Sequence, residues 1–169
     1  MNAYDKIEFK KEKISKEILT KILDAGRFAP TAKNLQPQRI YVIESEQGLN
    51  KLSKSTKYLH NAPTALLVCS DITVAYIKNH CTSYKADSIL ATMHMILEST
   101  HLGIDNIWIK DFDDINIQKD FNLGENIMPI SILLLGYKVD ETIGLKATDF
   151  NDMLLPSQRK GPEEIIKYI

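Results

Sequence analysis

The chain has 169 residues, 44% of them hydrophobic and 25% charged, with a formal net charge of −1. This composition is typical of a soluble globular protein, and we expect a single domain over residues 1–169. The balanced charge argues against a general affinity for nucleic acid or anionic membranes, and no apolar stretch reaches the roughly 20 residues that span a bilayer. The N-terminal segment is charged and has no apolar core of a signal peptide, so we expect a cytoplasmic protein with free thiols.

Hydrophobic periodicity predicts alternating helices and strands. The first helix is expected over residues 15–27, where Ser15 can cap the N-terminus and Pro30 prevents continuation. The further elements expected, in chain order, are a strand at 39–44, a helix at 46–57, a strand at 62–71, a helix at 84–102, a strand at 104–112, a helix at 115–123 and a strand at 129–138. This order predicts a layered domain of sheet and helices.

Two of these segments are the most strongly patterned. Residues 62–71 form a continuous apolar run typical of a central strand, and Cys69 within it is expected to pack as a small hydrophobe. Residues 84–102 repeat apolar side chains every three or four positions until Gly103, which predicts a buried core helix. The tail after residue 140 has little core-like pattern until residues 162–169.

Motifs for the common catalytic chemistries are missing from the sequence. The glycines are scattered and form no phosphate-binding loop, and no GxSxG element is present. His94 and His101 share a helix face but have no third ligand nearby, so we expect no metal site. Asp111, Asp113 and Asp114 are better explained by a solvated loop than by a pair of glycosidase carboxylates. Only Arg27, Arg39 and Arg159 are arginines, which marks each as a candidate anion contact.

The segment AGRFAPTAKNLQPQRIYVIES, residues 25–45, resembles the opening helix, loop and strand of the FMN-dependent nitroreductase family. The positions that match the family's A-P-S-x-x-N-x-Q-P motif are Ala29, Pro30, Asn34, Gln36 and Pro37, and Gln38 replaces the usual aromatic residue. Residues 87–113, 128–138 and 156–168 resemble later segments of the family in the same order. We therefore identify the sequence as similar to that family over most of its length.

The resemblance implies an α+β fold. It would be a three-layer domain with a central mixed or antiparallel sheet flanked by helices, and a C-terminal segment exchanged within a homodimer. It also implies FMN as cofactor and NADH or NADPH as electron donor. The acceptor would be a small molecule such as a nitroaromatic or a quinone, reduced by hydride or electron transfer through flavin N5.

Family-matched positions then indicate the site residues. Pro30, Thr31, Ala32 and Asn34 should lie against a flavin held mainly by the other subunit. Gln36 either shapes the start of the strand or contacts the flavin. Both alternatives stay open.

A second stretch, WIKDF at residues 108–112, matches the loop that presents a backbone N–H to flavin N5 in the family. Lys110 and Asp111 occupy that position here. A main-chain donor would remain in place when the side chain changes.

The N-terminus departs from the family. Where the family carries an R-R-S-type motif, this chain has Ala3, Tyr4 and Asp5, and Lys6 is the nearest cation. Arg159 matches a phosphate-binding basic position near the C-terminus and is the remaining anchor. The changed motif is the main support for one alternative, a degenerate dimer of the same fold that binds another ligand or none. A separate alternative is a structural or interaction domain unrelated to flavin.

Overall fold

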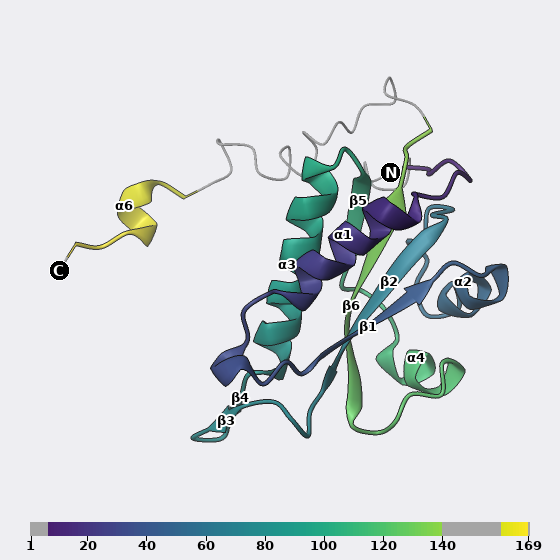
Figure 1. Cartoon of the computed structure of the whole chain (residues 1–169). Helices are drawn as coiled ribbons and strands as arrows, with labels where there is room; N and C mark the ends of the chain where they lie inside the picture. Colours follow the sequence, from purple (N-terminus) through teal and green to yellow (C-terminus); the bar gives the residue numbers. More distant parts are fainter. Residues whose placement is uncertain (1–6, 140–159, 169) are drawn as a thin grey trace.

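The structure is a computed structural model that describes residues 7–139 and 160–168 (Figure 1). The expected alternation of helices and strands is confirmed. The elements are α1 (Lys16–Arg27), η2 (Ala32–Asn34), β1 (Gln38–Ile43), α2 (Glu46–Leu52), β2 (Thr64–Asp71), β3 (Ile77–Lys78), β4 (Cys81–Thr82), α3 (Tyr84–His101), β5 (Asp105–Ile109), α4 (Asp114–Asp120), β6 (Ile127–Gly136) and α6 (Pro162–Ile165).

The central sheet has four strands in the order β1-β2-β6-β5, and every neighbouring pair is antiparallel. Gln38 at the start of β1 is paired with Ser70 near the end of β2, and Ser70 is paired with Met128 on β6. The α+β class with an antiparallel central sheet is therefore confirmed. β1 and β5 form the two edges, so the segment that precedes β1 and the segment that follows β5 lie at opposite edges of the sheet.

Helices cover both faces of the sheet, which gives three layers (Figure 1). Successive side chains of β2 alternate between the faces. Leu66 and Val68 pack with α1 and α3, whereas Leu67 and Cys69 pack with α2 and α4. Cys69 is fully buried, as expected of a small hydrophobe, and burial raises the pKa of its thiol to about 12.

Local signals set the ends of the helices on the α1–α3 face. Ser15 caps α1 by accepting a hydrogen bond from the Ile18 amide, as predicted. Gly103 follows α3 with φ of 72°, a left-handed conformation that favours glycine. Gly26 lets α1 approach α3, because a Cβ there would lie 2.8 Å from the Met95 side chain.

Some boundaries differ from the prediction. The helix expected at 46–57 ends at Leu52, because the following Ser-Lys-Ser-Thr run favours turns and Ser53 donates to the Asn50 carbonyl instead of extending the helix. The strand expected at 104–112 ends at Ile109. The β3–β4 hairpin was not predicted, although the Asn79-His80 pair, with φ of 50° and 65°, suits a two-residue turn.

The expectation of a buried core helix at 84–102 holds for one face only. Ala91, Met95 and Ile96 are buried, whereas Leu90 is 42% and Leu97 is 64% exposed. The apolar residues predicted near the C-terminus are also exposed: Ile165 on α6 by 67% and Tyr168 by 97%. Within the described residues, no helix combines the length and apolar character needed to cross a bilayer.

Candidate cofactor site

The loop before β1 has a defined and partly left-handed conformation. Lys33, Asn34 and Gln36 all have φ between 51° and 56°, a region that side chains other than glycine seldom adopt. The Thr31 hydroxyl accepts a hydrogen bond from the Gln36 amide at 3.1 Å, and Gln36 Nε2 donates to the Asn34 carbonyl at 3.0 Å. The matched motif residues therefore brace one another within a single compact loop.

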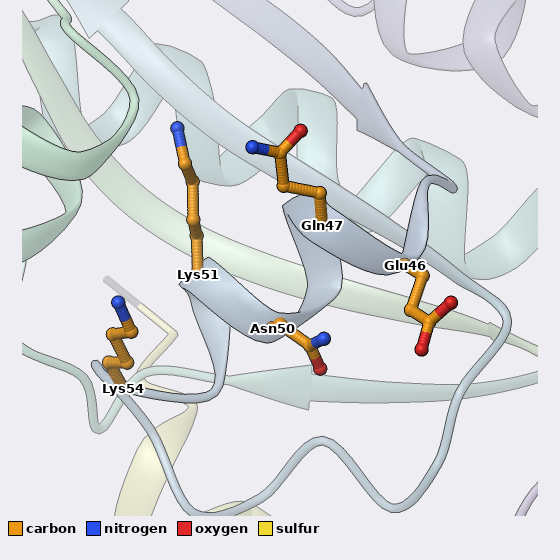
Figure 2. Close-up of a pocket in the computed structure, with 5 residues that line it drawn as sticks. All are labelled: Glu46, Gln47, Asn50, Lys51 and Lys54. Atoms are coloured by element: carbon orange, nitrogen blue, oxygen red, sulfur yellow. The ribbon is translucent and has the colours of Figure 1, made fainter.

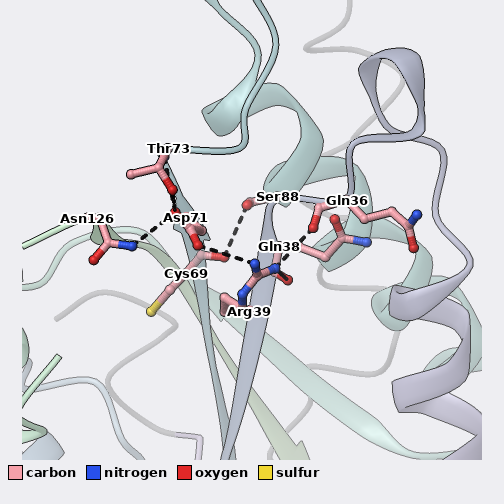
Figure 3. A network of polar contacts seen from close by, with 8 residues as sticks. All are labelled: Gln36, Gln38, Arg39, Cys69, Asp71, Thr73, Ser88 and Asn126. Carbon is pink, nitrogen blue, oxygen red and sulfur yellow. Dashed lines mark hydrogen bonds and ion pairs between the residues drawn. The ribbon is translucent and has the colours of Figure 1, made fainter. Parts of the chain in front are cut away.

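Arg39 fastens the C-terminal end of this loop (Figure 3). Its Nη1 donates to the carbonyls of Gln36 and Gln38, both at 3.0 Å, and its Nη2 lies 3.3 Å from Asp71 Oδ2. The guanidinium thus joins the loop to the end of β2.

Asp71 is the acceptor on which this network converges. Thr73 donates to Asp71 Oδ1 through both its hydroxyl and its amide, and Asn126 donates to the same oxygen. Hydrogen bonds from Thr73 and Asn126, together with the Arg39 charge, hold the pKa of the Asp71 carboxyl below its ordinary value. The scarcity of arginine marked Arg39 from sequence, but its partner Asp71 is 32 residues away and was not predicted.

We expect Arg39→Ala to lower the melting temperature by about 2–4 °C, the shift for about 1 kcal/mol in a chain of this size. The lost contacts are the two loop carbonyls and Asp71, with solvent screening limiting the ion pair because the Arg39 side chain is 40% exposed. Trypsin should also cut faster after exposed Lys33. Arg27→Ala, at an arginine in a surface pair with Asp24, is the matched control. Equal effects of the two substitutions would contradict the role of Arg39 in holding the loop.

At the other edge of the sheet, the residues after β5 are held by the Lys110 ammonium and by the Asp111 carbonyl. Lys110 Nζ donates to the Ile130 carbonyl at 3.1 Å, and burial, assisted by the Lys85 charge, lowers the pKa of Lys110. The Asp111 carbonyl accepts from Thr56 Oγ1 at 3.0 Å. The Asp111 amide donates to no acceptor within residues 7–139 or 160–168.

A pocket of about 490 Å³ lies between residues 7–8 and residues 53–61. Thr56, which holds the Asp111 carbonyl, is one of its lining residues. Ile7 and Glu8 also line it, and Ile7 follows directly after the predicted contact Lys6; the Ile7 carbonyl lies 3.0 Å from His60 Nδ1. The pocket therefore reaches Thr56, the residue that holds the Asp111 carbonyl, but neither Lys110 nor Asp111 lines it.

A second depression of about 440 Å³ lies along α2 (Figure 2). Its lining contains none of the predicted site residues and consists of Glu46, Gln47, Asn50, Lys51 and Lys54. Lys51 is already engaged, since its Nζ donates to the Asp120 carbonyl. We assign no role to this surface.

The structure thus brings the predicted residues together in two groups. Pro30, Thr31, Ala32, Asn34 and Gln36 share the loop before β1, and Lys110 and Asp111 follow β5. Three strand spacings, about 14 Å, separate these edges within one protomer. Lys6 and Arg159 lie outside the described residues. No group of three or more potential metal ligands occurs in the part of the chain that the structure describes.

Comparison with known proteins identifies relatives of this chain in sequence and in fold. Residues 5–59 match the profile of the nitroreductase family. A protein of Archaeoglobus fulgidus whose name refers to an NADH dehydrogenase or NAD(P)H nitroreductase is 32% identical over 143 residues, which is 80% of this chain and 81% of the relative. The predicted class, an oxidoreductase enzyme, agrees with this relative.

Solved structures agree with the sequence comparison. The crystal structure of a nitroreductase family protein from Clostridium difficile 630 has a TM-score of 0.83 and 34% identity, covering 95% of this chain and 90% of that one. A protein of Exiguobacterium sibiricum, described as a nitroreductase in complex with FMN, has a TM-score of 0.79 at 21% identity, covering 96% of this chain and 91% of that one, and shows likeness of fold. The chain therefore belongs to the nitroreductase family.

Proposed function

We propose that this protein is an FMN-dependent NAD(P)H oxidoreductase that reduces nitroaromatic, quinone or similar electrophilic small molecules. The observation that carries the proposal is the braced loop at residues 30–36, where the family motif is held in a strained but fully supported conformation. Strain of this kind persists where the surroundings hold it and is common at ligand sites. The FMN complex of the similarly folded Exiguobacterium sibiricum protein supports the choice of cofactor.

The residues of the loop suit a flavin. An isoalloxazine ring has flat apolar faces and a polar pyrimidine edge. Pro30 and Ala32 offer small apolar groups, whereas Thr31, Asn34 and Gln36 offer hydrogen-bonding groups on the same rigid segment. A fixed loop loses little conformational entropy when it binds, which favours affinity.

The segment after β5 suits the reactive edge of the ring. Among residues 7–139 and 160–168 the Asp111 amide has no acceptor, while Thr56 holds the Asp111 carbonyl and so fixes the direction of the peptide segment. When bound, FMN would take electrons from NAD(P)H and pass them to the acceptor, so the protein needs no acid–base side chains of its own. The role of the chain is to place donors, exclude water and orient the two substrates.

A homodimer would complete the site. The loop before β1 and the segment after β5 lie on opposite edges of one protomer's sheet, so a partner's loop is the natural way to bring both to one flavin. The exposed face of α3 supports this arrangement, because Leu90, His94, Leu97 and His101 recur at the spacing of a helix–helix seam. The exposed apolar residues of α6, which stands apart from the main body in Figure 1, would be covered by exchange onto the partner.

Arg159 is our candidate for the flavin phosphate, with Lys6 as a secondary cation. We expect Arg159→Ala to weaken FMN binding about ten- to a hundred-fold, the effect of losing one or two charge-assisted hydrogen bonds. A fluorescence titration with FMN measures it, and Arg27→Ala, on the exposed end of α1, is the control. An unchanged dissociation constant would move the phosphate contact to Lys6 or another lysine.

The second candidate function is a degenerate family member that binds another ligand or none. The observation that favours it is the replacement of the basic N-terminal motif by Ala3, Tyr4 and Asp5. Such a protein would keep the fold and the dimer but would not bind FMN.

An anaerobic turnover experiment tests the proposed function. Protein reconstituted with excess FMN is mixed with NADH or NADPH and then with a quinone. We expect NAD(P)H oxidation that depends on the protein, on FMN and on the quinone together. A rate equal to that of free FMN alone would contradict the proposal.

A further inference from the structure

One buried carboxyl group contacts the loop from outside. Asp87 lies in the first turn of α3, with only 3% of its surface exposed. Its Oδ1 accepts a hydrogen bond from the Ala32 amide at 3.0 Å, across 55 residues of sequence. Within the described residues no cationic side chain is ion-paired with it, so the contacts that hold it are hydrogen bonds.

The second carboxyl oxygen is also engaged. Asp87 Oδ2 accepts from the Ser83 hydroxyl at 2.6 Å, and the same hydroxyl accepts from the Tyr76 amide at 3.1 Å. The Tyr76 ring in turn lies 4.7 Å from Lys33 Nζ, and Lys33 follows Ala32. The contacts therefore form a closed circuit that runs from the loop through α3 and the segment before β3, and back to the loop.

We propose that Asp87 is a positioning residue for the cofactor: by holding the Ala32 amide it fixes the loop at residues 31–36 in the conformation that contacts flavin. The inference rests on the proposed function for its ligand, but the clamp itself is a property of this chain. Arg39 holds the C-terminal end of the loop, and Asp87 holds its beginning. Hydrogen bonds from both residues therefore hold the two ends of the left-handed segment.

The chemistry of the circuit requires a carboxylate. Ala32 and Ser83 are both donors toward Asp87, so both of its oxygens must accept. An asparagine has one acceptor and one donor. If its amide nitrogen faces Ala32, two donors meet; if it faces Ser83, the serine hydrogen loses its acceptor. Asp87→Asn therefore either sets two donors against each other at Ala32 or reverses the Ser83 contact and leaves Ala32 with a neutral, weaker acceptor, while volume and shape stay unchanged.

The control is Thr92→Val, in the same helix. Thr92 is buried and its hydroxyl lies 2.8 Å from Ser131 Oγ, but it does not contact the loop. It should cost stability of a similar size without changing the loop. This comparison separates a positioning role from a general loss of stability.

The experiment measures two quantities on the full-length wild-type protein, Asp87→Asn and Thr92→Val. The first is the hydrogen-exchange rate of the Ala32 amide in protein without FMN. The second is the FMN dissociation constant, with melting temperatures recorded for comparison. We expect Asp87→Asn to speed Ala32 exchange and to weaken FMN binding, each about ten-fold, which corresponds to about 1.4 kcal/mol. Thr92→Val should change neither beyond its effect on stability.

Equal behaviour of the two variants would overturn the proposal and leave Asp87 a structural residue of α3. If Asp87→Asn does not fold, Ser83→Ala replaces it, because it removes the support of Oδ2 and keeps the carboxyl; unchanged Ala32 exchange in that variant would also overturn the circuit. If the wild-type protein binds no FMN, the proposed function fails, and the Ala32 exchange rate alone then decides whether Asp87 holds the loop.

Discussion

Replacing Leu90 and Leu97 together with glutamate should convert the protein to a 19.2 kDa monomer that no longer retains FMN. Both leucines are exposed in one protomer, on a helix whose opposite face is already packed in the core. Two large apolar side chains on one exposed face of a helix whose other face is in the core have nothing to pack against in one protomer, so we expect a second copy to cover them. Two charges placed in such an interface would remain uncompensated and would prevent association.

Sedimentation at low micromolar concentration, with the flavin absorbance recorded in the same run, gives both outcomes. Ile115→Glu is the control, because Ile115 on α4 is 74% exposed and lies away from the α3 face. A wild-type protein that sediments as a monomer with FMN bound would contradict the site shared between two subunits. A double variant that stays dimeric would place the interface elsewhere.

Lys110→Pro should abolish turnover, whereas Lys110→Ala should keep most of it. Proline at position 110 fixes φ of that residue and removes its own N–H. Because this turns the following peptide unit, it moves the Asp111 amide that we assign to the flavin. The Lys110 ammonium donates to the Ile130 carbonyl, and burial lowers its pKa, so the side chain serves the sheet. Its loss should cost some stability and little activity.

Steady-state NAD(P)H oxidation with a quinone, at saturating FMN, distinguishes the two variants once each is shown to be a dimer. If alanine is as damaging as proline, the ammonium itself acts on the cofactor. If neither variant loses activity, the segment at residues 110–111 is not near the reactive edge of the flavin.

The fold could be predicted from the sequence where the pattern was local. The apolar run that became β2, the periodicity of α3 and the cap at Ser15 each determined an element within a few residues. The helix at residues 46–57 was predicted too long because polar periodicity continued through a segment whose serines prefer turns.

The site could be predicted only in part. Motif resemblance indicated the loop and the segment after β5, because their residue types are distinctive, and their contact with flavin stays a prediction. The contacts of Asp71 with Arg39 and of Asp87 with Ala32 were not found, because they span 32 and 55 residues and no local pattern reveals such partners. The exposed face of α3 was also missed, since periodicity shows that a face is apolar but not whether its own chain covers it.

Titration of the protein into FMN, followed by absorbance, tests the central claim most directly. We predict flavin bands that shift from those of free FMN and saturate at one FMN per chain, with FMN and protein sedimenting together as a dimer. Spectra that remain superimposable on free FMN at protein concentrations far above that of the flavin would contradict the claim and favour the degenerate dimer.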